Sequence, residues 1–436
     1  MKKLVLTLLG AALMAGSASA QVAVAKVDVA KLRSAITKAE GDSADPKKGA
    51  KAAAWVSLGD AYVDSEAKMV DGLYAGMPEN MLTIAFGEGA PAEQTVGGQA
   101  YKVYTYENVK VYAAGGTVSF WTPTTVVDPA ALSKAYDAYD KAYTMDAKSA
   151  KKVGAGMDNI HARGFENGSA YYSLGEFVKS ADNFRMAYRA SAHATAAAVD
   201  TMSLYYAGMA AANGEDYAAA KSDLDQALNM GYEHDGETYY MKFLAQYNLG
   251  EKESSLATLQ QGLARFPGNE NIIDMMVRYY AENDGDVTSI IPIVEAAIAQ
   301  NPTNPSLYQG LARVYDKLGQ SDDAIATIRK VVELTPEDFL SNYLEGYFIV
   351  KKGDAEAQAL GSKSFTNAGE YQAALAGVNN VFREAVAPLE KAYEINPEQL
   401  ATVELLKNLT FRLREEPGMG EKYEKYNTLY SSMPAN

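Results

Sequence analysis

Histidine, the side chain best suited to metal binding and acid–base chemistry at neutral pH, occurs at three positions, His161, His193 and His234. A helical metal site needs a second histidine or a carboxylate four positions along, so that both ligands share one face of the helix. None of the three histidines has such a partner in the sequence. The pattern therefore predicts solvated or capping histidines, not metal ligands.

The acidic stretch DGDVTSIIPIVE, residues 284–295, places Asp284, Asp286 and Glu295 at positions one, three and twelve of a calcium-binding loop. Position six of such a loop is glycine, because the chain turns sharply there, but this chain has Ser289. The hydrophobic pattern also predicts a helix over residues 290–298. We therefore expect no calcium site.

Motifs for nucleophilic or phosphate chemistry are missing from the sequence. The chain has no cysteine, so thiol catalysis and disulfides are excluded. It has no GxSxG, HExxH or P-loop motif, and the glycine-rich stretches GEGAPA and GAGMDN both lack a third glycine. Carboxylates are abundant, so their type alone leaves a glycosidase-like pair open, but scattered acidic residues usually solvate a surface. The sequence predicts no enzyme, no cofactor and no metal.

The elements that would position a binding site repeat along the chain. The stretch LYQGLARVYDKLGQSDDAIATIRKVVELTP, residues 307–336, reads as two amphipathic helices joined by a glycine turn. Small residues at Ala312 and Ala324 allow the two helices to approach closely, Gly319 permits the turn, and Pro336 ends the second helix. This pattern resembles the tetratricopeptide repeat (TPR), through Tyr308, Leu311, Ala312, Tyr315, Gly319, Ala324, Ile328, Val331 and Pro336.

Further copies of the pattern occur on both sides of this stretch. Gly208, Ala220 and Leu224 belong to one upstream copy, and Pro267, Pro302 and Pro336 lie 35 and 34 residues apart. This spacing matches the TPR unit of about 34 residues. The resemblance implies an all-α, superhelical solenoid of helical hairpins.

The copies divide the mature chain into seven repeat units. We expect N-terminal helices and the first helix of unit one within residues 21–66, and its second helix and a connection within 129–160. Units two to six follow at 161–338 and unit seven at 339–397. Residues 398–436 are off the pattern, as expected for capping helices.

Residues 67–128 interrupt the first unit with a small α+β module. Alternating Val and Tyr residues predict a β-meander with strands near 101–106, 109–112 and 117–121, and Gly115-Gly116 predicts a hairpin turn. A short helix and a glycine-rich loop precede the strands. This order resembles the small lipoprotein module of the outer-membrane barrel-assembly machinery. An unrelated hairpin gives the same pattern.

Residues 353–379 interrupt the seventh unit. This stretch is polar and rich in small residues, and we expect a loop with about one helical turn. Long loops in repeat proteins are either functional or disordered. The sequence leaves open which description applies here, and also the role of the first insertion.

The N-terminus predicts export. Residues 1–20 combine Lys2 and Lys3, an apolar run and a small-residue cut site after Ala20, which is typical of a secretory signal peptide in bacteria. With no cysteine there is no lipid anchor of the lipobox type, so we expect a periplasmic or secreted protein with no membrane span. The net charge of −15, about −17 once the two lysines are removed, argues against nucleic acid as a partner.

The resemblance to TPR proteins implies a concave groove lined by the first helix of each unit. Positions 2, 5, 9, 12 and 13 of the units face that groove, and the chain carries aromatic, amide and some charged residues there. Such side chains suit a peptide, because tyrosine offers contact area at low entropic cost and amides pair with backbone groups. The candidate binding residues are Phe165, Tyr172, Tyr205, Asn213, Tyr240, Tyr247, Asn248, Met275, Tyr279, Asn283, Gln309, Arg313, Asp316, Lys317, Tyr343 and Tyr347.

Asn213, Asn248 and Asn283 recur at intervals of 35 residues, a ladder that could hold an extended chain. Packing between neighbouring repeats explains the same residue types equally well.

These observations favour an exported TPR scaffold that binds protein or peptide partners in the bacterial cell envelope without catalysis. The alternative is a glycan-binding component of an outer-membrane uptake system, because starch-utilisation binding proteins also carry TPR helices and aromatic platforms. Those proteins are lipid-anchored, whereas this chain has no anchoring cysteine and only two tryptophans. The partner and the oligomeric state remain open at this stage.

Overall fold

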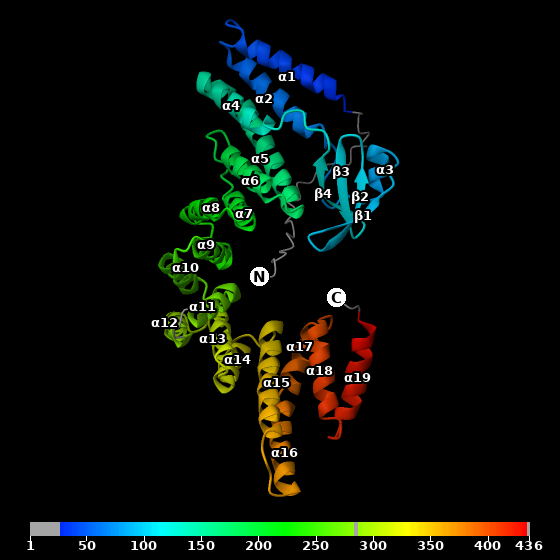
Figure 1. The fold of residues 1–436 in the computed structure, drawn as a ribbon, viewed down its shortest axis with the longest axis vertical. Coiled ribbons are helices and arrows are strands. Elements are labelled where there is room, and N and C mark those ends of the chain that lie inside the picture. Colours follow the sequence, from blue (N-terminus) through cyan, green and yellow to red (C-terminus); the bar gives the residue numbers. More distant parts are fainter. Residues whose placement is uncertain (1–26, 283–286, 434–436) are drawn as a thin grey trace. The chain divides into compact units, whose positions relative to one another are not determined.

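The computed structural model describes residues 27–282 and 287–433, and the predicted signal peptide lies outside them (Figure 1). The described chain divides into two units. Unit 1 contains the residues up to 233 together with 244–251, and unit 2 contains 234–243 and the residues from 252 onward. Both units are built from antiparallel helical hairpins, and unit 1 also contains a small sheet (Figure 1). The predicted all-α repeat fold with a β insertion is confirmed.

The hairpins of unit 1 follow the predicted order. Helix α1 packs on α2, α2 pairs with α4 across the insertion, and α5 pairs with α6 and α7 with α8. The bounds are α1 Val29–Ala44, α2 Ala52–Ala67, α4 Ala131–Met145, α5 Ala150–Ser173, α6 Phe177–Ser191, α7 Met202–Asn213 and α8 Tyr217–Asn229. Helix α9, Glu237–Asn248, is shared by the two units.

Glycine lets the paired helices of unit 1 approach closely. A Cβ added to Gly59 of α2 would lie 2.6 Å from the ring of Tyr139 on α4, which is too close for any side chain. Tyr139 is 1% exposed, and its hydroxyl donates a hydrogen bond of 2.7 Å to Asp60. The hairpin is therefore held by a large ring seated against a glycine, which is the close approach that the repeat pattern predicts.

Unit 2 is also built from helical hairpins. Helix α13 pairs with α14, α15 pairs with α17, and α18 with α19 at the C-terminal end. The bounds are α10 Lys252–Arg265, α11 Glu270–Glu282, α12 Ile290–Gln300, α13 Pro305–Lys317, α14 Ser321–Leu334, α15 Phe339–Gly361, α16 Ala368–Glu384, α17 Val386–Ile395, α18 Leu400–Arg412 and α19 Met419–Ser432. The helix expected at 290–298 is present as α12, while Asp284 and Asp286 lie outside the described residues.

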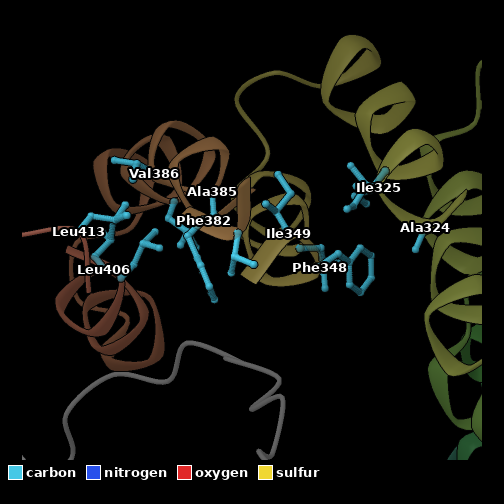
Figure 2. Packing of buried hydrophobic residues seen from close by; sticks show 14 of the residues in the cluster. Ala324, Ile325, Phe348, Ile349, Phe382, Ala385, Val386, Leu406 and Leu413 are labelled. Carbon is cyan, nitrogen blue, oxygen red and sulfur yellow. The ribbon is translucent and has the colours of Figure 1, made fainter. Parts of the chain in front are cut away.

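The core of unit 2 lies along α15. Figure 2 shows Phe348 of α15 pointing toward Ile325 of α14, while Phe382 of α16 lies on the other side of α15. Leu406 and Leu413, from the α18 region, extend the same buried cluster. Burial of these apolar side chains is the main force that holds the hairpins in register, since each hairpin alone would expose one apolar face.

The first insertion forms a four-stranded antiparallel sheet in the order β1-β2-β3-β4. Its elements are α3 Met81–Phe86, β1 Ala92–Val96, β2 Gln99–Thr105, β3 Val109–Ala114 and β4 Thr117–Pro123. The expected meander had three strands and lacked β1. The sequence AEQTV of β1 has few β-branched or aromatic residues, and its pairing with β2 through the Gly97-Gly98 turn determines its conformation.

Both faces of this sheet are covered. One face buries Val111, Val118 and Trp121 against Leu82 of α3 and the segment that precedes it. The other face packs Tyr112 and Phe120 with residues near the C-terminal end of α5 (Figure 1). The insertion is therefore fixed to the repeat array and is not a free appendage of unit 1.

The prediction of a loop at residues 353–379 is wrong. Helix α15 continues to Gly361, and α16 begins at Ala368, so the segment forms a second hairpin on α15. Asn367 caps α16 by accepting from the Glu370 amide, and the Glu370 carboxylate accepts in return from the backbone N–H of Thr366. Alanine and glycine obscure the apolar periodicity of this stretch, in which Leu360, Val378 and Phe382 are buried.

The start expected for the second repeat, at 161, is also too late. Helix α5 begins at Ala150, and its additional turns bury Val153, Met157 and Ile160. These residues are spaced by four and three positions, so they share one face that packs in the core with α2 and α4. The segment assigned to a connection is the first half of a long helix.

Candidate partner-binding face

The candidate residues lie on the first helix of each hairpin, but the structure gives them different roles. In unit 1 they are carried by α5, α7 and the end of α9, and in unit 2 by the start of α9, α11, α13 and α15. Asn283 lies outside the described residues.

Two aromatic candidates in unit 1 are packing residues. Tyr205 is 3% exposed, and its ring contacts Tyr206 at 5.4 Å and Tyr232 at 5.7 Å. Phe165 is partly buried and meets Phe184 edge-on at 5.4 Å. The assignment of Tyr205 to a partner-binding groove is therefore wrong, because a ring inside a core has almost no surface for a ligand.

Tyr172 and Asn213 contact each other across α5 and α7. The Asn213 side-chain amide donates to the Tyr172 hydroxyl at 3.2 Å and to the Met209 carbonyl of its own helix at 2.8 Å. Asn248 likewise donates to the Leu244 carbonyl four residues earlier, at 2.7 Å. Both side chains are exposed. Asn213 directs its side-chain amide to two acceptors within the chain, and Asn248 directs one of its two N–H donors to its own helix.

The insertion covers the end of α5 next to Tyr172. Ala170 and Leu174 pack against the sheet, and a Cβ added to Gly97 in the β1–β2 turn would lie 3.9 Å from the Ser173 carbonyl oxygen. Ser173 occupies the thirteenth position of its repeat, which faces the groove in the family pattern. At α5, that surface is occupied by the chain itself.

A charge cluster between α2 and α5 lies where the insertion begins. Arg163 of α5 pairs with Glu166, and the Glu66 carboxylate of α2 is hydrogen-bonded to the Asn167 side chain. Burial raises the pKa of Glu66, and burial lowers the pKa of the Arg163 guanidinium. Asp71 adds a favourable charge interaction with Arg163. The cluster joins the two helices and the start of the insertion.

The histidines hold turns in place. His161 lies 2.9 Å from the Asp200 carboxylate, and the Ser203 hydroxyl donates to the same carboxylate at 2.6 Å. In a catalytic triad the serine would bond to the histidine, which it does not do here. Asp200 also accepts from the Met202 amide at the start of α7. Burial by itself would raise the pKa of Asp200. The hydrogen bonds from His161 and Ser203 outweigh this effect, so the pKa lies below its usual value.

His193 lies between Thr195 and Asp140, at 2.8 and 3.3 Å. Within residues 27–282 and 287–433, no group of three or more acidic, histidine or cysteine side chains is placed to bind a metal ion.

In unit 2 the charged candidates brace neighbouring helices. Arg313 of α13 pairs with Glu270 of α11, and Lys317 pairs with Asp274 at 3.3 Å. Asp316 of α13 accepts from Lys351 of α15 at 2.6 Å. These pairs run from one first helix to the next, so they fix the spacing of the repeats.

Two further candidates in unit 2 have internal contacts. Gln309 donates to the Ser341 hydroxyl at 3.2 Å, which joins α13 to α15. Tyr279 is 9% exposed, and its hydroxyl donates to the Lys252 carbonyl at 3.2 Å. Its assignment to the groove surface is therefore wrong. Tyr240 and Met275 of unit 2 are partly buried, as is Tyr247 in the part of α9 that belongs to unit 1, and burial raises the pKa of Tyr240.

Three aromatic residues of α15 follow one another along one face of the helix. Phe339, Tyr343 and Tyr347 lie four residues apart, and their rings stack at centroid distances of 5.9 and 6.1 Å, with interplanar angles of 19° and 15°. We call these three residues the aromatic ladder. Tyr347 is 37% exposed, and Tyr343 is partly exposed. Residues four apart on a helix share one face, so the ladder is a continuous apolar strip with two hydroxyl groups.

Two further aromatic residues of unit 2, Phe339 and Phe411, were not among the sequence candidates. Phe339 begins the ladder, and its position four residues before Tyr343 was the available signal. Phe411 of α18 is 47% exposed, and Arg414 lies over its ring at 4.2 Å. It was missed because the repeat register ended at residue 397, so α18 was assigned to a cap.

Comparison with known proteins agrees with this architecture. A tetratricopeptide repeat family model matches residues 139–343. This part of the chain is built from tetratricopeptide repeats. The matched segment contains α5 to α14, the hairpins described above on both sides of the division between the units. The TPR fold is a protein-interaction scaffold. No curated protein matches the chain.

Solved structures resemble the TPR chain in fold alone. A TPR repeat protein from Bacteroides fragilis is 15% identical, with 58% of this chain and 98% of that chain covered and a TM-score of 0.26. The C-terminal part of a TPR repeat-containing protein from Cytophaga hutchinsonii is 13% identical, with 62% and 96% covered and a TM-score of 0.34.

The human IFIT1 dimer with m7Gppp-AAAA is 15% identical at a TM-score of 0.35, and covers 70% of this chain. The match spans 65% of IFIT1, just under two thirds of its length.

No helix within residues 27–282 and 287–433 is both long and apolar enough to span a membrane.

Proposed function

We propose that the TPR chain is an exported scaffold of the bacterial cell envelope, and that it binds a protein or peptide partner on the aromatic ladder of α15 without catalysing a reaction. The ladder carries the proposal, because Tyr347 is 37% exposed, while Tyr205 and Tyr279, also at first-helix positions, are 3% and 9% exposed. Aromatic strips of this kind are enriched in protein interfaces.

The spacing of the ladder fits an extended peptide. Its rings are 5.9 and 6.1 Å apart, and alternate residues of an extended strand are separated by about 6.6 Å. Side chains on one face of a bound strand would therefore meet successive rings nearly in step. The hydroxyl groups of Tyr343 and Tyr347 can serve the backbone of such a strand as donors or acceptors.

An exposed carboxylate adjoins the ladder. Glu404 of α18 interacts electrostatically with Tyr343, and it makes no ion pair with any described residue. A partner with a lysine or arginine at this point would gain both a charge interaction and contact with a ring.

Glycan binding is the second candidate. Sugars usually bind against the open face of an aromatic ring, whereas the rings of the ladder stack on one another. This arrangement favours a polypeptide partner over a glycan. The absence of a lipobox cysteine from the sequence points in the same direction.

Export is supported by the sequence of residues 1–20, which has the charged start, apolar stretch and small-residue cut site of a signal peptide. Fractionation of the cells that make the protein tests this part separately. We expect a mature chain that begins at Gln21 in the periplasm or medium, and a full-length chain in the cytoplasm would contradict it.

Crosslinked co-purification from the native envelope tests the binding site. The variant combines Tyr343→Ala and Tyr347→Ala, and the matched control is Tyr371→Ala, which removes a tyrosine of similar exposure, 40%, from α16. Circular dichroism establishes that both variants fold. We expect the control to retain the partner and the double variant to lose it.

If the double variant retains every partner, the ladder is not the binding site. A glycan array probed with the same proteins covers the alternative: glycan binding that depends on Tyr343 and Tyr347, with no protein partner, would replace the scaffold proposal.

A further inference from the structure

The two outer strands of the inserted sheet differ in how their outer edges are covered. The outer edge of β4 is covered by the segment 76–79, because the Gly76 amide donates to the Val118 carbonyl and the Val118 amide to the Met77 carbonyl, both at 2.8 Å. Pro78 forms an isolated bridge with Thr117. At the opposite side of the sheet, β1 is the edge strand, and β2 is its one neighbour in the sheet. Ala92 to Thr95 are exposed and Val96 is partly exposed.

The geometry of the hairpin shows which backbone groups of β1 point outward. Val96 and Gln99 flank the two-residue Gly97-Gly98 turn, so they form a pair that exchanges hydrogen bonds. Bonding alternates along an antiparallel strand, so Gln94 and Ala92 also bond toward β2. The N–H and C=O groups of Glu93 and Thr95 therefore point away from the sheet. An edge of this kind is a template for another strand.

The strand is complementary to itself. Antiparallel pairing of two copies about Gln94 would place Glu93 opposite Thr95 of the other copy, twice, and these are the two residues with outward backbone groups. Gln94 would face Gln94, and Ala92 would face Val96. No like charges meet, and amide and small apolar pairs are favourable cross-strand neighbours. Glu93 also has Lys102 as its cross-strand neighbour within the sheet.

The residues at the two ends of β1 limit the length over which it can pair. The Gly97-Gly98 turn at one end has no side chains, and Pro91 at the other end has no amide hydrogen, so the pairing segment is limited to residues 92–96. Both faces of the present sheet are already covered by apolar contacts. The added strand would extend a layered structure and would not expose a new apolar face.

From these observations we propose that the β1 edge is an interface between two copies of the TPR chain, in which β1 pairs antiparallel with β1 about Gln94 to give one continuous sheet. The proposal is independent of the aromatic ladder. The pairing involves five residues from each copy, a small contact area, so the dimer should be weak and form in a concentration-dependent way.

Sedimentation velocity of the mature chain over a wide concentration range tests the proposal. The decisive variants are Gln94→Lys and Gln94→Glu, because each would place two like charges face to face on the symmetry axis. We expect dimerisation of the wild type, at least a tenfold weaker dimer for each variant alone, and recovery of a dimer when the two variants are mixed in equal amounts. A dimer that is weak for each variant alone but recovers in the mixture is expected only if residue 94 of one copy lies opposite residue 94 of the other copy.

A second pair of variants tests the backbone contact. Thr95→Pro removes an outward N–H while leaving the hydrogen bonds to β2 intact, and Thr95→Val is its control because it keeps the N–H. We expect a monomer for Thr95→Pro and a dimer for Thr95→Val, with circular dichroism spectra like that of the wild type.

The proposal is overturned if the wild type stays monomeric at the highest concentration, or if both Gln94 variants dimerise as the wild type does. If the wild type is monomeric and Thr95→Pro nevertheless loses a partner crosslinked from the envelope, the edge accepts a strand from a different protein, and pairing between copies is excluded.

Discussion

Tyr205 in unit 1 and Tyr343 in unit 2 occupy the same position of their repeats, on the first helix of a hairpin, but they have different environments. Tyr205 is 3% exposed among Tyr206 and Tyr232, which come from α7 and from the segment after α8. Tyr343 stacks with Phe339 and Tyr347 of its own helix and stays partly exposed. The same residue type serves packing in one repeat and offers a surface in another, according to where its aromatic neighbours lie.

The inserted sheet adds to this difference. In unit 1 the chain places its own sheet against Ala170 and Leu174 at the end of α5. In unit 2 the second insertion, α16, packs on α15 through Phe382 and Gly353, while Tyr347 of the ladder stays exposed. The two insertions therefore have opposite consequences for the face on which a partner would bind.

The largest expected effect is the loss of a buried ring from unit 1. Tyr205→Ala should lower the free energy of unfolding by about 3–5 kcal/mol, because it empties a packed aromatic site. Tyr343→Ala should cost less than about 2 kcal/mol, since the ring is already partly hydrated in the folded state. Urea unfolding followed by circular dichroism measures both values. Equal losses for the two variants would remove the basis of the comparison.

A charge placed under the sheet should release the insertion from α5. Ala170 is 3% exposed against the sheet, so Ala170→Asp would bury a carboxylate without a partner, at a cost on the order of 3 kcal/mol. We expect faster proteolysis at the 97–98 turn and faster hydrogen exchange in β2. Ala162→Asp, on an exposed face of the same helix, is the control and should behave as the wild type. Unchanged proteolysis of Ala170→Asp would mean that the sheet does not depend on α5.

The charge cluster of unit 1 should make stability depend on pH through Glu66. Burial raises the pKa of this carboxyl in the folded state, so the folded chain holds the proton more tightly than the unfolded chain. The wild type should therefore lose stability relative to Glu66→Gln as the pH rises from the ordinary value of 4.5 to the raised pKa, and the difference should be constant above it. Thermal unfolding of both proteins across this range measures the trend. If the wild type instead became more stable relative to Glu66→Gln as the pH rises, the raised pKa of Glu66 would be contradicted.

The smallest expected effect concerns the ion pairs of unit 2. Lys351→Met breaks the bond to Asp316 and should change the free energy of unfolding by less than about 1 kcal/mol, since partly exposed pairs contribute little. Partner capture should be unchanged, because this pair braces α13 and α15 and is not part of the ladder. A loss of capture comparable to that of the Tyr343 and Tyr347 double variant would move the binding site to the charged residues.

The repeat architecture could be predicted because its determinants are local. Pro302 and Pro336 end second helices at a spacing of 34, and Ala312, Ala324 and Gly319 mark close packing and a turn. These features depend on residues within one hairpin, so a single repeat reveals them. The β3–β4 turn at Gly115-Gly116 was predictable for the same reason, and both glycines have positive φ angles, 58° and 80°.

Other elements depend on contacts that the sequence does not display. Strand β1 forms because it pairs with β2, although its own residues have little strand preference. Helix α16 is rich in alanine and glycine, which obscures the period of its two buried side chains, Val378 and Phe382. Exposure at the groove positions was the least predictable feature, because Tyr205 and Tyr343 have the same type and repeat position. Only the neighbours brought to them by other helices separate the two.

Site-specific photo-crosslinking tests the central claim most directly. A photoreactive phenylalanine analogue replaces Tyr347 in the ladder or, in a separate protein, Tyr172 beside the inserted sheet, and irradiation follows in the native envelope. We predict an adduct with a protein partner from position 347 and none from position 172, since the chain itself covers that end of α5. Adducts from position 172 but not from 347 would contradict the account and place the partner on unit 1.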